Sequence, residues 1–208
     1  KVENSFINYF RADTEIYKGM KLIDDELGGT TPLDIIIKFD DEKDNSDDEE
    51  YDELLGDSED SNESNWFTTD KINKIKYVHD YLDSNQYIGK VLSFASSIRV
   101  AEMVNDNNEL DSLEMSLLYK KLPEEVKEIA VNPYLSIEDN EARINIRVLD
   151  SNPNLRRAEL IETIRYDLNN DSYLSSEKIT LSGILILYNN MLQSLFDSQI
   201  KSLGFVMI

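Results

Sequence analysis

"EARINIRV", residues 141–148, decides the fold of this chain, because its apolar and polar side chains alternate without a break. Successive side chains of a strand point to opposite faces, so this alternation predicts a strand with one face on a core and the other in water. The apolar positions are Ala142, Ile144, Ile146 and Val148. The preceding "PYLSIEDN" turns at Asp139 and Asn140, and the two segments together predict a β-hairpin.

A β-α-β unit is predicted upstream of this hairpin. Within "TTPLDIIIKF", residues 30–39, one face of a strand carries Leu33, Ile35, Ile37 and Phe39. A helix follows, which Thr69 can cap and whose inner side carries Ile72, Ile75, His79 and Leu82. A short strand over residues 91–95 completes the unit.

A second helix and strand are predicted downstream. Asn152 as a cap and Pro153 in the first turn indicate the start of a helix, whose buried stripe is Leu155, Ala158, Ile161, Ile164 and Leu168. "EKITLSGILIL", residues 177–187, then predicts a strand. Residues 98–133 are predicted to be a helical insertion in short pieces, with Pro123 as the first residue of one of them.

The order β-α-β, helical insertion, β-α-β is that of a split β-α-β or ferredoxin-like plan. The predicted fold class is therefore α+β, with helices on one face of a mainly antiparallel sheet.

Both ends of the chain are predicted to be amphipathic helices. Residues 12–27 place Ile16, Met20, Ile23 and Leu27 at helical spacing, with Asp13 as N-cap and Gly28 just past the end. Residues 179–208 hold only two charges and become more apolar toward their end. We therefore expect a leading helix over 1–32, a central domain over 33–187 and a trailing helix over 188–208, whose last six residues begin a membrane span.

Charge is concentrated in one segment. The chain has a net charge of -21, and residues 40–64 alone contain 14 Asp or Glu against one Lys. Such a field repels phosphate backbones, so the sequence excludes nucleic acid as a partner. We expect an acidic disordered insertion there, because it has too few apolar residues to offset its ordering entropy. A cation-binding module for calcium is the alternative function, although the segment lacks the EF-hand register.

Residues for catalysis are scarce. The chain has no cysteine, and its single histidine, His79, lies on the apolar side of a helix. Asp80 is about 100° further around that helix, so the two do not form a dyad. We interpret His79 as a core-edge residue with a satisfied hydrogen bond, and we predict no enzyme activity, no catalytic or metal-binding residue and no cofactor.

Two other features have a functional and a structural interpretation. "LGGTTP", residues 27–32, resembles a phosphate loop, but it runs from helix to strand, so Gly28 and Gly29 are better explained as a helix cap and a turn. Arg143 and Arg147 project from one strand face and could line a cleft for anionic or amphiphilic cargo. Salt bridges to neighbouring acids are the simpler interpretation.

Four stretches carry a resemblance to a known family. They are "VENSFINYFRADTEIYKGMKLIDDELGGTTPLDIII" (2–37), "SLLYKKLPEEVKEIAVNPYLS" (116–136), "RVLDSNPNLRR" (147–157) and "LYNNMLQSLFDSQIKSLG" (187–204). In this order they resemble exporters of the resistance-nodulation-division (RND) superfamily, in the branch grouped with MMPL-type lipid transporters. The resemblance covers nearly the whole chain except the acidic insertion.

The resemblance implies an extracytoplasmic porter-domain loop of a bacterial inner-membrane protein, on the periplasmic side. Such exporters move hydrophobic or amphiphilic substrates, lipids included, and are driven by protons that pass through charged residues of the membrane helices. The implied partners are those transmembrane helices, the second porter loop and a further copy in a homo-oligomer. No proton-relay position falls within this chain, so the resemblance assigns it no catalytic residue and leaves the residues of the substrate path undefined.

Overall fold

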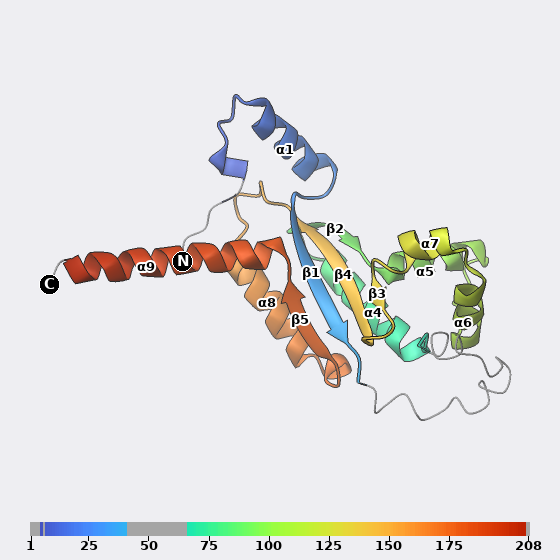
Figure 1. Ribbon diagram of the computed structural model, residues 1–208. Helices are drawn as coiled ribbons and strands as arrows, with labels where there is room; N and C mark the ends of the chain where they lie inside the picture. The colour runs from blue at the N-terminus through green and yellow to red at the C-terminus, as the bar shows by residue number, and fades with distance from the viewer. Residues whose placement is uncertain (1–4, 6, 41–65, 207–208) are drawn as a thin grey trace.

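The computed structural model of the protein describes residue 5, residues 7–40 and residues 66–206 (Figure 1). The helices are α1 (Glu15–Glu26), α4 (Thr69–Asp83), α5 (Phe94–Val104), α6 (Ser112–Lys121), α7 (Glu124–Ala130), α8 (Arg157–Asn170) and α9 (Ile184–Val206), with the 3-10 turns η1 (Ile7–Tyr9) and η3 (Ser172–Leu174). The strands are β1 (Thr31–Lys38), β2 (Ile88–Leu92), β3 (Leu135–Ser136), β4 (Glu141–Val148) and β5 (Lys178–Ser182). The predicted α+β class is confirmed.

The strands form one antiparallel sheet of five strands. Its order is β2-β4-β1-β5, and the short β3 pairs with β4. β4 therefore lies between β1 and β2, and these two strands run in the same direction without touching. Ile35 stands opposite Ile144 on β4 and opposite Leu181 on β5, so β1 is hydrogen-bonded on both edges.

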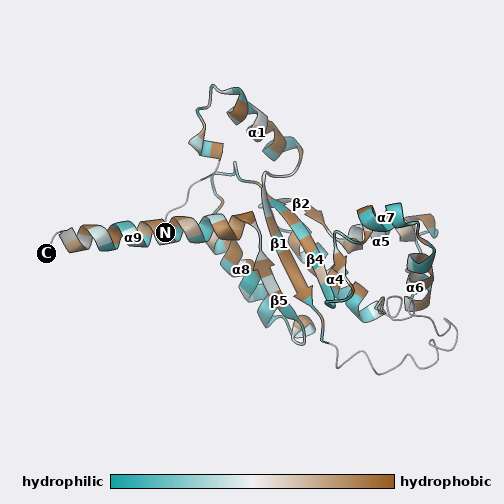
Figure 2. Cartoon of the chain, viewed as in Figure 1, coloured by the Kyte–Doolittle hydropathy of each residue, from teal (hydrophilic) through white to brown (hydrophobic). Residues whose placement is uncertain are grey.

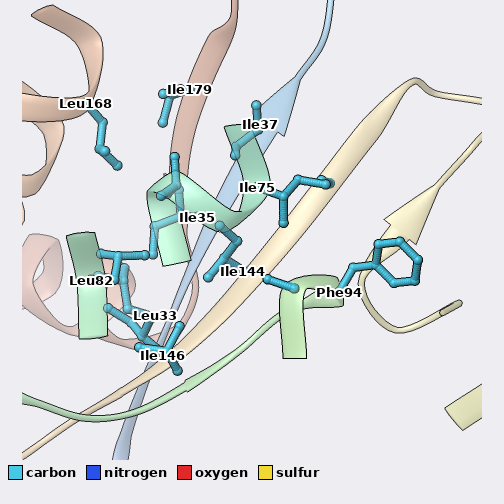
Figure 3. Close-up of a cluster of buried hydrophobic side chains, with 14 of the residues drawn as sticks. Leu33, Ile35, Ile37, Ile75, Leu82, Phe94, Ile144, Ile146, Leu168 and Ile179 are labelled. Atoms are coloured by element: carbon cyan, nitrogen blue, oxygen red, sulfur yellow. The ribbon is translucent and has the colours of Figure 1, made fainter. Parts of the chain in front are cut away.

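The core lies on one face of this sheet. Figure 3 shows Leu33, Ile35 and Ile37 of β1 beside Ile144 and Ile146 of β4, with Ile75 and Leu82 of α4 and Leu168 of α8 packed against them. All eight side chains are at most 2% exposed. The apolar residues of the alternating pattern that predicted β4 therefore face this core, and its polar residues lie on the opposite face.

Helix and strand boundaries differ from the predictions in several places. The N-caps are Thr14 instead of Asp13 and Thr68 instead of Thr69. The strand predicted over 91–95 is β2, which ends at Leu92, three residues before the predicted end. Ser93 leaves the sheet there, and its hydroxyl accepts from the N–H of Ala95 to cap α5. The helical insertion consequently starts at Phe94, and Pro123 is the N-cap of α7, not its first residue.

The second half needs two further corrections. Asn152 and Pro153 do not begin α8, whose N-cap is Arg156; Asn152 instead accepts from the N–H of Asn154 in a turn. The strand predicted over 177–187 ends at Ser182, because Gly183 adopts a φ of 107° and the chain enters α9. The apolar residues that follow belong to the helix. The hairpin turn at Asn140, with a φ of 53°, is confirmed.

A buried polar network joins the N-terminal segment, α1 and α8 to the segment that follows β4. The guanidinium of Arg157 on α8 pairs with Asp150, and its Nε donates to Asp150 Oδ1 at 2.8 Å. Asp150 also accepts from the Ser5 hydroxyl at 2.6 Å and from the Ile7 N–H. Asp24, in the last turn of α1, accepts from the backbone N–H groups of Asp150 and Ser151. Although burial alone raises the pKa of Asp24, these hydrogen bonds and those from Thr30 hold it below its usual value.

Three glycines let the turn after α1 pack on the sheet backbone. Gly28 and Gly29 have φ values of 80° and 110°, and the N–H of Gly29 donates to the carbonyl of Asp24 to close the helix. A Cβ on Gly28 would lie 2.5 Å from the carbonyl oxygen of Gly89, and one on Gly89 would lie 2.7 Å from the Gly28 carbonyl. The predicted helix cap and turn are confirmed.

The first and last helices carry apolar side chains in contact with water. On α1, Ile16, Leu22 and Ile23 are 57%, 62% and 41% exposed. On α9 the exposed apolar residues are Ile184, Leu187, Met191, Leu195, Phe196, Ile200, Leu203 and Phe205. Figure 2 shows hydrophobic bands along α9 where it extends away from the sheet. Among the described residues, no helix has the length and apolar character needed to cross a membrane.

Gly89→Ala is expected to lower the free energy of unfolding by about 2 kcal/mol or more, because the new methyl group would overlap backbone that cannot move aside. Chemical denaturation measures the change. Gly19→Ala on α1 is the matched control. In the described part of the chain, no neighbouring side chain or other element lies within 4 Å of the Cβ that this substitution adds, so it should raise the free energy of unfolding by up to about 1 kcal/mol. Equal effects of the two substitutions would contradict the close packing.

Asp150→Ala is expected to cost about 3–5 kcal/mol, because it leaves the buried Arg157 guanidinium without its carboxylate. Glu162→Ala, which breaks an exposed pair with Arg165 on the same helix, should cost less than about 1 kcal/mol. Denaturation curves measured side by side test the difference, and a small loss for Asp150→Ala would show that the network is dispensable.

Candidate functional site: an apolar pocket in the helical insertion

A candidate binding site is a pocket of about 820 Å³ among α5, α6 and α7. Its floor is continuous with the core through Phe67, Phe94, Ile98, Met115 and Val131, all of which are buried. Its walls are the apolar sides of the three helices, which include Ala101 and Val104, Leu117 and Leu118, and Val126 and Ala130. A cavity of this volume and lining is of the size that takes a small organic ligand.

Contacts between different elements fix the positions of the three helices around the pocket. Ser97 on α5 donates to the carbonyl of Ala130 on α7 at 2.8 Å. The Thr69 N–H donates to the Ser112 hydroxyl at 2.9 Å and thereby fixes the start of α6 to α4. At the floor, the ring centroids of Phe67 and Tyr119 are 4.7 Å apart. The pocket is thus built by tertiary contacts between helices that are each only two or three turns long.

Apolar residues in and beside the pocket wall remain in contact with water. Val100 and Val104 of the lining are 62% and 83% exposed, and their neighbours on the same helices, Met103 on α5 and Ile129 on α7, are 69% and 76% exposed. Exposed apolar residues around an apolar cavity are typical of a site that binds a hydrophobic ligand or another protein.

The polar groups at the pocket offer little chemistry. The Ser97 hydroxyl is already bonded to Ala130, and the Glu114 carboxylate accepts from the N–H of Asp111 in a capping box. Lys121 lies at the end of α6 and is the cation of the lining. The rest of the lining is mainly apolar, which is typical of a binding site.

His79 lies outside the pocket and has a structural role. It is 6% exposed, and its Nδ1 shares a hydrogen bond of 2.8 Å with the fully buried Ser93 hydroxyl. The interpretation as a core-edge histidine with a satisfied hydrogen bond is confirmed. Burial, and then the charge of Arg99, lower the pKa of His79. Asp80 faces away and pairs with Arg99.

Arg143 forms an ion pair with a neighbouring strand. Its Nε and one terminal nitrogen both lie 3.0 Å from the carboxylate of Asp34, to which Asn145 also donates. The simpler interpretation, an ion pair on a solvated strand face, is therefore confirmed for Arg143. Arg147 lies on the same face and is half-buried.

The predicted calcium site falls on residues 40–64, of which only Asp40 is described. In the described ranges no three His, Asp or Glu side chains come together as a set of metal ligands. The calcium alternative stays a prediction about residues outside the described part.

Comparisons with known proteins identify no relative: no family model, no curated protein and no solved structure matches this chain.

Sequence reasoning did not identify the pocket. Leu113, Leu117 and Leu118 recur at helical spacing, which predicts a helix in the insertion but no pocket. The available signal was an excess of apolar residues: three helices of 11, 10 and 7 residues carry more large apolar side chains than so small a unit can bury.

The free energy of unfolding is expected to fall as the pH drops below about 6.5, the ordinary pKa of histidine, because His79 takes up its proton more readily in the unfolded chain than in the buried site. His79→Gln should show a smaller loss between pH 7 and pH 5. The Asp24 contribution is lost only at more acidic pH, as its lowered pKa is passed. Identical pH profiles for both proteins would contradict the assignment.

Proposed function

We propose that this chain is an extracytoplasmic porter domain of a proton-driven RND-type exporter, and that the apolar pocket binds its hydrophobic or amphiphilic substrate. The observation that carries the proposal is the pocket itself, about 820 Å³ with a mainly apolar lining. Its position supports the proposal too, because it lies in the region of "SLLYKKLPEEVKEIAVNPYLS", one of the stretches that carry the family resemblance.

The fold is compatible with this role. We infer a ferredoxin-like plan from the strand order β2-β4-β1-β5 with α4 and α8 as the two crossover helices. The helices α1 and α9, which both carry exposed apolar side chains, are the elements that would connect such a domain to membrane helices. The partners under this proposal are the transmembrane helices, the second porter loop and a further copy of the transporter.

Substrate passage would require α6 and α7 to move relative to α5. The bonds that hold them are few: the Ser97 hydroxyl to the Ala130 carbonyl, and Ser112 to the start of α4. Rigid subdomains that rock against each other could open and close the pocket in this way. Protonation would take place in the membrane helices, and the resulting movement would reach the pocket through the ends of the domain.

Ala101→Trp is expected to weaken binding of the apolar fluorophore N-phenyl-1-naphthylamine by about tenfold, because an indole would fill the cavity that Ala101 lines. A fluorescence titration of the purified chain measures the affinity. Ala12→Trp is the matched control, since Ala12 is exposed and distant from the lining. Equal affinity of the wild type and both variants would place the fluorophore outside the pocket.

The transporter assignment has its own test, which does not depend on the fluorophore. The gene should continue directly after Ile208 with about 15 or more apolar residues, enough to complete a membrane span. A stop codon or a polar continuation would overturn the exporter assignment and leave a hydrophobic-ligand-binding protein.

A further inference from the structure

The face of the sheet opposite the core has no role in the proposed function. Its side chains alternate with the core residues along each strand, and Thr180 and Ser182 of β5 are exposed on it. The helices α4 and α8 pack on the other face, with the core between them and the strands. We call this solvent-facing side the open face.

The open face is positively charged, although the chain as a whole is strongly acidic. It carries five cations and two acids: Lys38, Lys90, Arg143, Arg147 and Lys178 against Asp34 and Glu141. The resulting excess of three positive charges contrasts with a net charge of -21 for the whole chain.

Like charges stand directly opposite each other at both ends of the open face. Lys90 of β2 faces Arg147 of β4, and these two residues form the first cationic pair. Lys178 of β5 faces Lys38 of β1, and these form the second cationic pair. Cross-strand pairs of like charge destabilise a sheet unless an opposite charge lies near them.

Neighbouring acids compensate these pairs only in part. Glu141 lies 3.5 Å from the amine of Lys38, and Asp34 is engaged by Arg143. Within the described ranges, Lys90, Arg147 and Lys178 form no ion pair. Three cations on the open face are therefore available to an anionic partner.

The spacing of the two cationic pairs indicates an extended partner. On β1, Pro32 stands opposite Arg147 and Lys38 stands opposite Lys178, so the pairs are six residues apart along the strand and two strands apart across the sheet. At about 3.3 Å per residue and about 4.8 Å between strands, the pairs are roughly 22 Å apart, a distance that an extended peptide running diagonally across the sheet covers in about six or seven residues.

We propose that the open face binds an acidic polypeptide segment in extended conformation, with carboxylates about six residues apart over the two cationic pairs. Charge complementarity selects this occupant. A bilayer or a nucleic acid extends far beyond the face and meets the net charge of -21, whereas a short segment lies within about 8 Å, the screening distance in physiological salt, of the cations.

The probe is a fluorescein-labelled peptide of Ser and Thr residues that contains two Asp-Asp-Glu clusters. Equivalent positions in the two clusters are six residues apart. Fluorescence anisotropy at low salt should show binding to the wild-type chain that weakens as salt is added. The double substitution Lys90→Glu/Lys178→Glu should weaken it about tenfold or more, because it reverses one cation of each pair. Each new Glu faces a remaining cation, so the melting temperature should stay the same or rise.

The matched control is Lys18→Glu/Arg165→Glu, which reverses two exposed cations on α1 and α8 and changes the net charge equally. The control should bind the peptide as tightly as the wild type. No binding, or equal losses in both double variants, would overturn the proposal. Binding of vesicles rich in phosphatidylglycerol that depends on Lys90 and Lys178, without peptide binding, would also overturn it and assign the face to a membrane.

Discussion

The buried pair of Asp150 and Arg157 is the interaction on which the arrangement of the chain ends depends. Asp150 follows β4 and Arg157 begins α8, and both side chains are at most 7% exposed. Two desolvated charges are tolerated only because their remaining hydrogen-bonding positions are satisfied by the Ser5 hydroxyl and by backbone groups. Asp24 extends the network to α1. A contact of η1 with α9 lies nearby: burial, and then a hydrogen bond with Tyr9 of η1, raise the pKa of Tyr188 on α9.

This anchoring and the pocket lie in separate parts of the molecule. The sheet, α4 and α8 share one buried core, to which α1 is attached through the buried carboxylate of Asp24. The helical insertion α5–α7 lies at the other end of the fold, as Figure 1 shows, and contains the apolar pocket. Displacement of the terminal helices would therefore be transmitted through the sheet to the insertion as a whole. In the proposed exporter this is the route that would link membrane helices to the substrate.

The sheet was predictable because its two central strands have clear local patterns. β4 alternates strictly and β1 is rich in β-branched residues, so both could be recognised without tertiary information. The boundaries of β2 and α8 were not, because Phe94, Ala95 and Leu155 are buried in the same core as the expected elements although they lie outside β2 and α8. Burial alone does not distinguish the last residue of a strand from the first of a helix.

The polar network and the pocket could not be predicted, because both depend on contacts that are distant in sequence. Asp24 and Asp150 are two of 42 acidic residues, and nothing local distinguishes them before the turn after α1 meets the sheet. The pocket requires α5, α6 and α7 to pack at a distance from one another, which helical periodicity does not specify.

The most direct measurement of the pocket's role is photo-crosslinking of the intact protein with an alkyl diazirine, followed by mass spectrometry. Adducts should concentrate on α5, α6 and α7 and disappear with excess unlabelled alkyl ligand, whereas adducts confined to the exposed stripes of α1 and α9 would contradict a ligand site in the insertion.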